Sequence, residues 1–96
     1  MTLDELRREK RIQILSLAQR HGASNVRVFG SVARGFATDT SDVDLLVDFS
    51  PERSLLDQVA LSQDLQKLLG CRVDVVEPGG VSPYLAEAIL SEAIPL

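Results

Sequence analysis

The chain has 96 residues, of which 45% are hydrophobic and 25% are charged, as is typical of a single globular domain. Its formal net charge of −4 provides no general basic field for binding nucleic acid, so a nucleic-acid partner is not expected. One cysteine excludes an internal disulfide, and no apolar run approaches membrane-spanning length, so we expect a protein of the reducing cytoplasm without a membrane partner.

The N-terminal segment is predicted to be a helix. Thr2 and Glu5 form a capping box, apolar residues then recur at helical spacing, and Gly22 ends the helix. A basic run within residues 7–11 is interleaved with acidic residues. That mixture is typical of a solvated helical face and not of an RNA-binding one.

The next segment is predicted to be a strand, a short helical stretch and a second strand. Residues 25–29 are rich in strand formers, and Gly30-Ser31 then turns the chain into a short helix. Residues 38–41 are expected to form a polar loop. The second strand is predicted over 42–49, where apolar residues alternate with aspartates.

A third helix is predicted between Ser54 and Gly70. Ser54 with Asp57 caps its start, and Gly70 provides the residue that commonly follows a helix end. The expected buried stripe of this helix consists of Leu55, Leu56, Val59, Leu65, Leu68 and Leu69.

A third strand over 72–76 and a last helix beginning at Ser82-Pro83 complete the chain. The order αβαβαβα predicts an α/β fold with a small mixed three-stranded sheet, in one domain covering residues 1–96. Helices packed on one face of that sheet would leave its other face as an open cleft.

Three aspartates lie in the last two predicted strands. Because aspartate is depleted in strands, Asp42, Asp44 and Asp74 are candidate functional residues. Side chains two apart in a strand leave the same face, roughly 6.5 to 7 Å apart along the chain. Convergent carboxylates of this kind suit hard divalent cations. Two opposite faces are therefore expected for the second strand: a core face with Val43, Leu45, Val47 and Phe49, and a carboxylate face with Asp42, Asp44, Leu46 and Asp48.

The Gly30-Ser31 turn is a candidate phosphate-binding element. A glycine at a strand-to-helix turn lets a ligand approach the backbone, whose unpaired N–H groups favour an anion. The Ser31 hydroxyl can add a hydrogen bond to a phosphate oxygen. The sequence thus places a phosphate cradle before a carboxylate cluster.

These residues resemble a known family motif. Gly30-Ser31, ten intervening residues and Asp42-Val43-Asp44 resemble the G-S-x10-D-x-D motif of the superfamily typified by DNA polymerase beta. The strings FGSVARG and SDVDLLVDF are similar to minimal nucleotidyltransferases, the MNT domains encoded beside HEPN-domain partners. The resemblance covers essentially the whole chain, although relatives often carry an acidic residue where Phe36 stands.

The resemblance implies a nucleotidyltransferase that moves AMP from ATP to a protein hydroxyl, releases pyrophosphate and uses magnesium as two ions. Asp42 and Asp44 would hold the metal, and Asp74 would be a third carboxylate that ligates it or deprotonates the acceptor. Gly30, Ser31 and Arg34 would bind the triphosphate. The implied acceptor and partner is a HEPN toxin, modified on a tyrosine within a hetero-oligomer, which makes this chain an antitoxin.

Other interpretations of the same residues stay open. A non-catalytic antitoxin could neutralise its partner by binding alone. Asp42 and Asp44 could be solvated residues at a strand start, and Asp74 an exposed residue of a half-wet strand. Arg34 could reach a phosphate, contact the partner or form a surface salt bridge.

Overall fold

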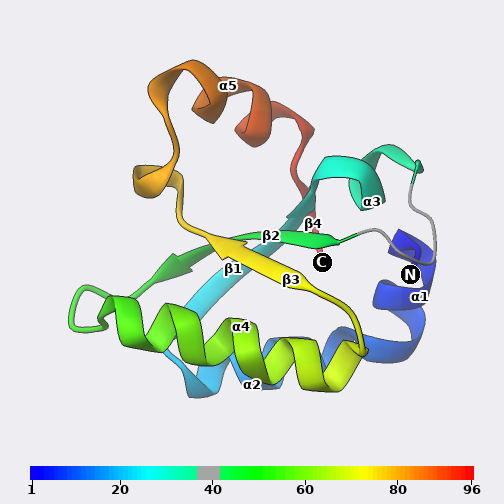
Figure 1. Cartoon of the computed structure of the whole chain (residues 1–96), viewed down its shortest axis with the longest axis horizontal. Helices are drawn as coiled ribbons and strands as arrows, with labels where there is room; N and C mark the ends of the chain where they lie inside the picture. The colour runs from blue at the N-terminus through cyan, green and yellow to red at the C-terminus, as the bar shows by residue number, and fades with distance from the viewer. Residues whose placement is uncertain (37–41) are drawn as a thin grey trace.

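The computed structural model describes residues 1–36 and 42–96 and has an α/β architecture in which helices lie on both sides of one sheet (Figure 1). The loop predicted over 38–41 lies outside the described residues. The elements in chain order are α1 Leu3–Glu5, the π-helical turn η1 Leu6–Lys10, α2 Arg11–Arg20, β1 Ala23–Phe29, α3 Gly30–Arg34, β2 Val43–Phe49, α4 Leu55–Leu69, β3 Val73–Val76, the 3-10 turn η2 Pro78–Gly80, α5 Pro83–Glu92 and β4 Ile94–Pro95.

Within the described residues the sheet is mixed and has four strands in the order β3-β2-β1-β4. β2 and β3 are parallel, whereas β1 is antiparallel to both β2 and β4. The α/β class and mixed sheet are confirmed, but the predicted count of three strands is too low. β4 has only two residues and contains Pro95, so it carries no recognisable strand pattern.

α4 begins and ends where its sequence predicts. The Ser54 hydroxyl accepts from the Leu56 N–H, and the Ser54 N–H donates to the Asp57 carboxylate at 2.9 Å. This backbone hydrogen bond is the main cause of the lowered pKa of Asp57. At the other end, Gly70 has φ of 71° and the left-handed conformation that favours glycine.

The hydrophobic core lies between the sheet and the two long helices α2 and α4. Val43, Leu45 and Val47 of β2 are fully buried on this side, as the alternation predicts, whereas Phe49 is only partly buried. Ile14 of α2 and Leu65 of α4 meet them in the same apolar cluster. Burial of such side chains contributes roughly 1.5–3 kcal/mol each, which makes this layer the main source of stability.

The opposite face of the sheet is covered in part by η2 and α5. Figure 1 shows α5 on the other side of the sheet from α2 and α4. Leu46, predicted on the open carboxylate face, is fully buried there, and η2 contacts β2. α5 itself contains no buried residue, so this cover is thin.

The predicted buried stripe of α4 is wrong in its first half. Leu55, Leu56 and Val59 are 71%, 79% and 46% exposed, respectively. The residues of α4 that reach the core are Leu61, Leu65 and Leu69, four apart. One turn before Leu61 this stripe falls on the polar residue Asp57, so the earlier apolar residues lie beside it and face outward.

The two ends of the chain are joined by hydrogen bonds. Arg7 donates to the Pro95 carbonyl at 3.0 Å, and Arg11 donates to the Leu96 carbonyl at 2.8 Å. Half of the basic run within residues 7–11 therefore holds the C-terminal segment against the first helix. No helix within residues 1–36 and 42–96 has the length and apolarity needed to cross a bilayer.

Candidate active site

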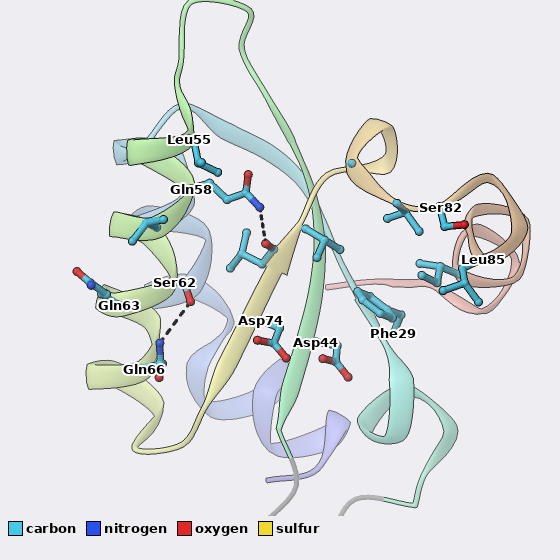
Figure 2. Close-up of a pocket in the computed structure, with 16 residues that line it drawn as sticks. Phe29, Asp44, Leu55, Gln58, Ser62, Gln63, Gln66, Asp74, Ser82 and Leu85 are labelled. Carbon is cyan, nitrogen blue, oxygen red and sulfur yellow. Dashed lines mark hydrogen bonds between the residues drawn. The ribbon is translucent and has the colours of Figure 1, made fainter.

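A groove of about 660 Å³ crosses the edge strand β3 and separates α4 from α5. Figure 2 shows Asp44 and Asp74 side by side within it, with α4 on one side and Phe29 and Leu85 on the other. Its walls combine apolar side chains with a few polar ones, as is usual for small-molecule sites. The predicted open cleft is therefore present, and two of the three predicted carboxylates line it.

Asp44 and Asp74 are neighbours because the parallel strands β2 and β3 place them in register. The pKa of Asp44 is raised from 3.8 to about 6, first by burial and then by the negative charges of Asp74 and Asp42. Hydrogen bonding with the Asp74 side chain and the charge of Glu92 act in the same direction. A divalent cation between such carboxylates would relieve the repulsion that raises this pKa.

The Gly30 turn packs directly against this pair. Gly30 has φ of 73°, and a Cβ placed on it would overlap the Oδ2 atom of Asp44. Glycine is required here both for its backbone conformation and for the space beside the carboxylate. The Gly30 N–H donates to Oε1 of Glu92, the last residue of α5, at 3.1 Å.

Asp42 lies just before β2, and its carboxylate is near the guanidinium group of Arg72. The Arg72 Nε atom is 3.9 Å from Asp42 Oδ2 and 3.9 Å from Asp74 Oδ1. The Asp42 side chain is 43% exposed. Among the residues that the structure describes, no three His, Cys, Asp or Glu side chains are gathered closely enough to form a metal site. Asp42, Asp44 and Asp74 thus share one end of β2 and β3 but do not converge as a ligand set.

The remaining predicted site residues occupy α3. Ser31 follows Gly30 in the first turn and is partly buried, whereas Arg34 is the exposed last residue of the helix. None of Gly30, Ser31 and Arg34 lines the groove. Gly30 adjoins it through its contact with the Asp44 carboxylate, whereas Arg34 lies at the periphery.

Sequence reasoning missed several residues of the groove and of its surroundings. Gln58 and Ser62 of α4 donate to the Val75 and Val73 carbonyls at 2.7 and 2.6 Å, which fixes the outer edge of β3 (Figure 2 shows the first contact). Their spacing of four along a helix was the available signal. Arg72 could have been found from its place two residues before Asp74. Glu92, 62 residues from Gly30, had no local signal.

The family of the chain follows from comparison with known proteins. Residues 10–96 match the family described as nucleotidyltransferase domain. The chain belongs to this family. Family membership makes it a nucleotidyltransferase, and it confirms the resemblance drawn from the glycine-serine turn and the aspartate pair.

Individual relatives agree with this assignment. Protein adenylyltransferase MntA of Thermococcus cleftensis is 38% identical over 94 residues, which are 98% of this chain and 95% of the relative. A solved structure provisionally described as a minimal nucleotidyltransferase is 55% identical, with a TM-score of 0.87 over 100% of this chain and 97% of the other. A toxin-antitoxin structure with AMP-PNP has a TM-score of 0.77 over 90% of this chain and 71% of the other; at 22% identity this likeness concerns the fold alone.

Proposed function

We propose that the chain is a protein adenylyltransferase that moves AMP from ATP to a tyrosine hydroxyl of a partner HEPN toxin and so acts as its antitoxin. The observation that carries this proposal is the Asp44–Asp74 pair against the Gly30 turn. Two carboxylates in register, one with its pKa raised to about 6, destabilise the folded state and have no evident packing role. The relative from Thermococcus cleftensis, a protein adenylyltransferase by name, supports the same activity.

The donor set fits magnesium by its chemistry. Asp44 and Asp74 offer hard oxygen ligands whose mutual repulsion a divalent cation would lower, and Asp42 lies near enough to share the Arg72 side chain with Asp74. We propose that Asp42, Asp44 and Asp74 hold the ion or ions, with the cation drawing the three carboxylates closer together than they lie in this structure. When bound, the metal would neutralise charge on the phosphates at the reacting centre.

The chain's own residues would perform three tasks in the transfer. The backbone at Gly30 and the Ser31 hydroxyl would bind the triphosphate, with Arg34 reaching it from the end of α3. The acceptor hydroxyl oxygen would form a bond to the α-phosphorus as the bond from that phosphorus to the leaving pyrophosphate breaks. The Asp74 carboxylate would orient the hydroxyl and take its proton.

The test is transfer of label from α-labelled ATP, with magnesium, onto the HEPN-domain partner. We expect Asp44→Asn and Asp74→Asn each to lower the transfer rate by about 100-fold or more, as loss of a charged group at a phosphoryl site does. Asp48→Asn is the matched control, because Asp48 is also on β2 but binds Arg27 and Asn25. Full activity of the first two variants would refute the assigned roles.

A second function, neutralisation by binding alone, is favoured by the exposed apolar residues beside the groove. Leu55 and Leu56 of α4 and Tyr84 and Leu85 of α5 are 58% or more exposed, and clustered apolar exposure marks protein-binding surfaces. Toxin neutralisation by Asp42→Asn/Asp44→Asn separates the two functions. An enzyme loses neutralisation in this variant, whereas a pure binder retains it.

Two further assignments complete the proposal. We propose that residues 1–96 act as one domain, supported by the bonds from Arg7 and Arg11 to the C-terminal carbonyls. We also propose that the chain works in the cytoplasm, within a hetero-oligomer with its toxin. Size-exclusion chromatography of the co-expressed pair tests the complex.

A further inference from the structure

The contact between Gly30 and Glu92 joins the turn of the site to the far end of α5. The Gly30 N–H donates to Glu92 Oε1 at 3.1 Å in a partly buried position. In the proposed reaction this same N–H binds the triphosphate. A carboxylate oxygen and a phosphate oxygen accept the same charge-assisted hydrogen bond, and a single N–H directed at one of them is not free for the other.

Glu92 also places negative charge where a nucleotide would bring more. Its carboxylate is close enough to Asp44 to contribute to that residue's electrostatic environment, together with Asp74 and Asp42. A triphosphate entering beside the Gly30 turn would meet Glu92 as a like charge. The hydrogen bond from Gly30 to Glu92 and the negative charge of Glu92 therefore both oppose the binding of an anion at this position.

The attachment of α5 allows Glu92 to be displaced. No residue of α5 is buried, and Tyr84, Leu85 and Leu90 are 94%, 58% and 47% exposed. The helix is connected to β3 through the short η2 turn and is followed by the two-residue strand β4. Because Glu92 is not packed in a core, its side chain can leave the Gly30 N–H at far less cost than a buried side chain of α2 or α4 could move, even though the β4 segment that follows is paired with β1.

We propose that Glu92 mimics a substrate phosphate: in the free chain its carboxylate occupies the Gly30 N–H, and a nucleoside triphosphate binds by displacing it. This inference rests on the proposed function, because it assumes that the triphosphate uses the Gly30 turn. It makes Glu92 a positioning residue that sets nucleotide affinity and couples the site to α5.

Nucleotide affinity tests the proposal directly. The dissociation constant of AMP-PNP with magnesium is measured by calorimetry for wild type, Glu92→Gln and Glu92→Ala. We expect both variants to bind about threefold to tenfold more tightly, because a competing charge has been removed. Glu87→Gln is the matched control, since it removes the same charge from an exposed position of α5 that does not line the groove, and should stay within about twofold of wild type.

The outcomes separate this inference from the function on which it rests. If no protein binds AMP-PNP, nucleotide use by this chain is refuted, and the inference with it. If wild type binds and the Glu92 variants bind equally or more weakly, only the inference is overturned, and weaker binding would make Glu92 a supporting ligand.

A measurement on the wild-type chain avoids any dependence on variant folding. Titration with magnesium and AMP-PNP, followed by the backbone amide resonances in two-dimensional NMR, should shift Gly30 and Glu92 together with the same apparent affinity. Displacement requires this coupling, because the acceptor leaves as the ligand arrives. A shift of Gly30 with Glu92 unmoved overturns the proposal.

Discussion

The two faces of the sheet differ in how tightly they are packed. On the face of α2 and α4, apolar side chains such as Ile14, Leu45 and Leu65 are fully or almost fully buried. On the other face, the covering helix α5 contains no buried residue of its own, and a groove of about 660 Å³ holds half-buried carboxylates. Stability is thus concentrated on one side of the sheet and candidate chemistry on the other, and substitutions on the two sides should change different quantities.

The largest expected effect on stability comes from the core side. Leu65→Ala removes a side chain that is 1% exposed and should lower the free energy of unfolding by about 3 kcal/mol. Urea denaturation measures the change. Leu56→Ala on the same helix is the control, because Leu56 is 79% exposed and its loss should cost less than about 0.5 kcal/mol. Equal losses at both positions would contradict the packing difference.

The next largest effect is expected at Gly30, where a substitution should change both the stability of the fold and the candidate site. Gly30→Ala should lower the free energy of unfolding by about 1–3 kcal/mol through its positive φ, and should also abolish AMP transfer because the new Cβ displaces the Asp44 carboxylate. Gly70→Ala provides the comparison. Gly70 has φ of 71° but open space around its Cβ position, so it should cost similar stability and leave transfer intact. Loss of transfer in both variants would argue that strain alone is responsible.

How far the sequence predicted the structure depends on how local each feature is and not on the face of the sheet where it lies. The caps of α4, the alternation of β2 and the pairing of Asp44 with Asp74 depend on residues near one another in sequence or on ordinary strand geometry, and these were predictable. The exposure of Leu55 and Leu56 was not, because helical periodicity does not say which end of an apolar stripe has a partner. The Gly30–Glu92 contact was equally inaccessible, since it depends on where α5 lies.

The third prediction concerns a gain in stability on the groove side. The pKa of Asp44 is about 6 in the fold against 3.8 for the unperturbed group, so the ionised carboxylate destabilises the folded state at pH 7. Asp44→Asn should therefore raise the free energy of unfolding by about 1 kcal/mol at pH 7, a value reduced for the partial solvent exposure of the group. The variant should be inactive in transfer and yet more stable.

The pH dependence fixes the sign of this effect. Below pH 3.8 the Asp44 carboxyl is protonated in both folded and unfolded states, and the stability advantage of Asp44→Asn should vanish. It should grow as the pH rises from 3.8 to about 6, because the unfolded-state carboxyl then loses its proton while the folded-state carboxyl retains it, and it should level off above about 6. Melting temperatures of wild type and variant across this range measure it. A variant that melts below wild type at pH 7 would show that Asp44 stabilises the fold.

The last prediction concerns the outer edge of β3, which forms the boundary between the two sides and where no large effect is expected. The Ser62 hydroxyl donates to the Val73 carbonyl at 2.6 Å, and Ser62→Ala should lower the free energy of unfolding by about 1 kcal/mol. Gln63→Ala, which also removes a polar side chain of α4 at the groove, should change it by less than about 0.5 kcal/mol because Gln63 is exposed.

AMP transfer by Ser62→Ala then tests what positions Asp74. The inner edge of β3 is paired with β2, where Asp74 is in register with Asp44, and this pairing does not involve Ser62. We therefore expect transfer to stay within about twofold of wild type despite the lower stability. A larger loss of transfer, with Gln63→Ala unaffected, would mean that α4 holds the carboxylate in place through the outer edge, and that the packed side of the molecule determines the geometry of the groove.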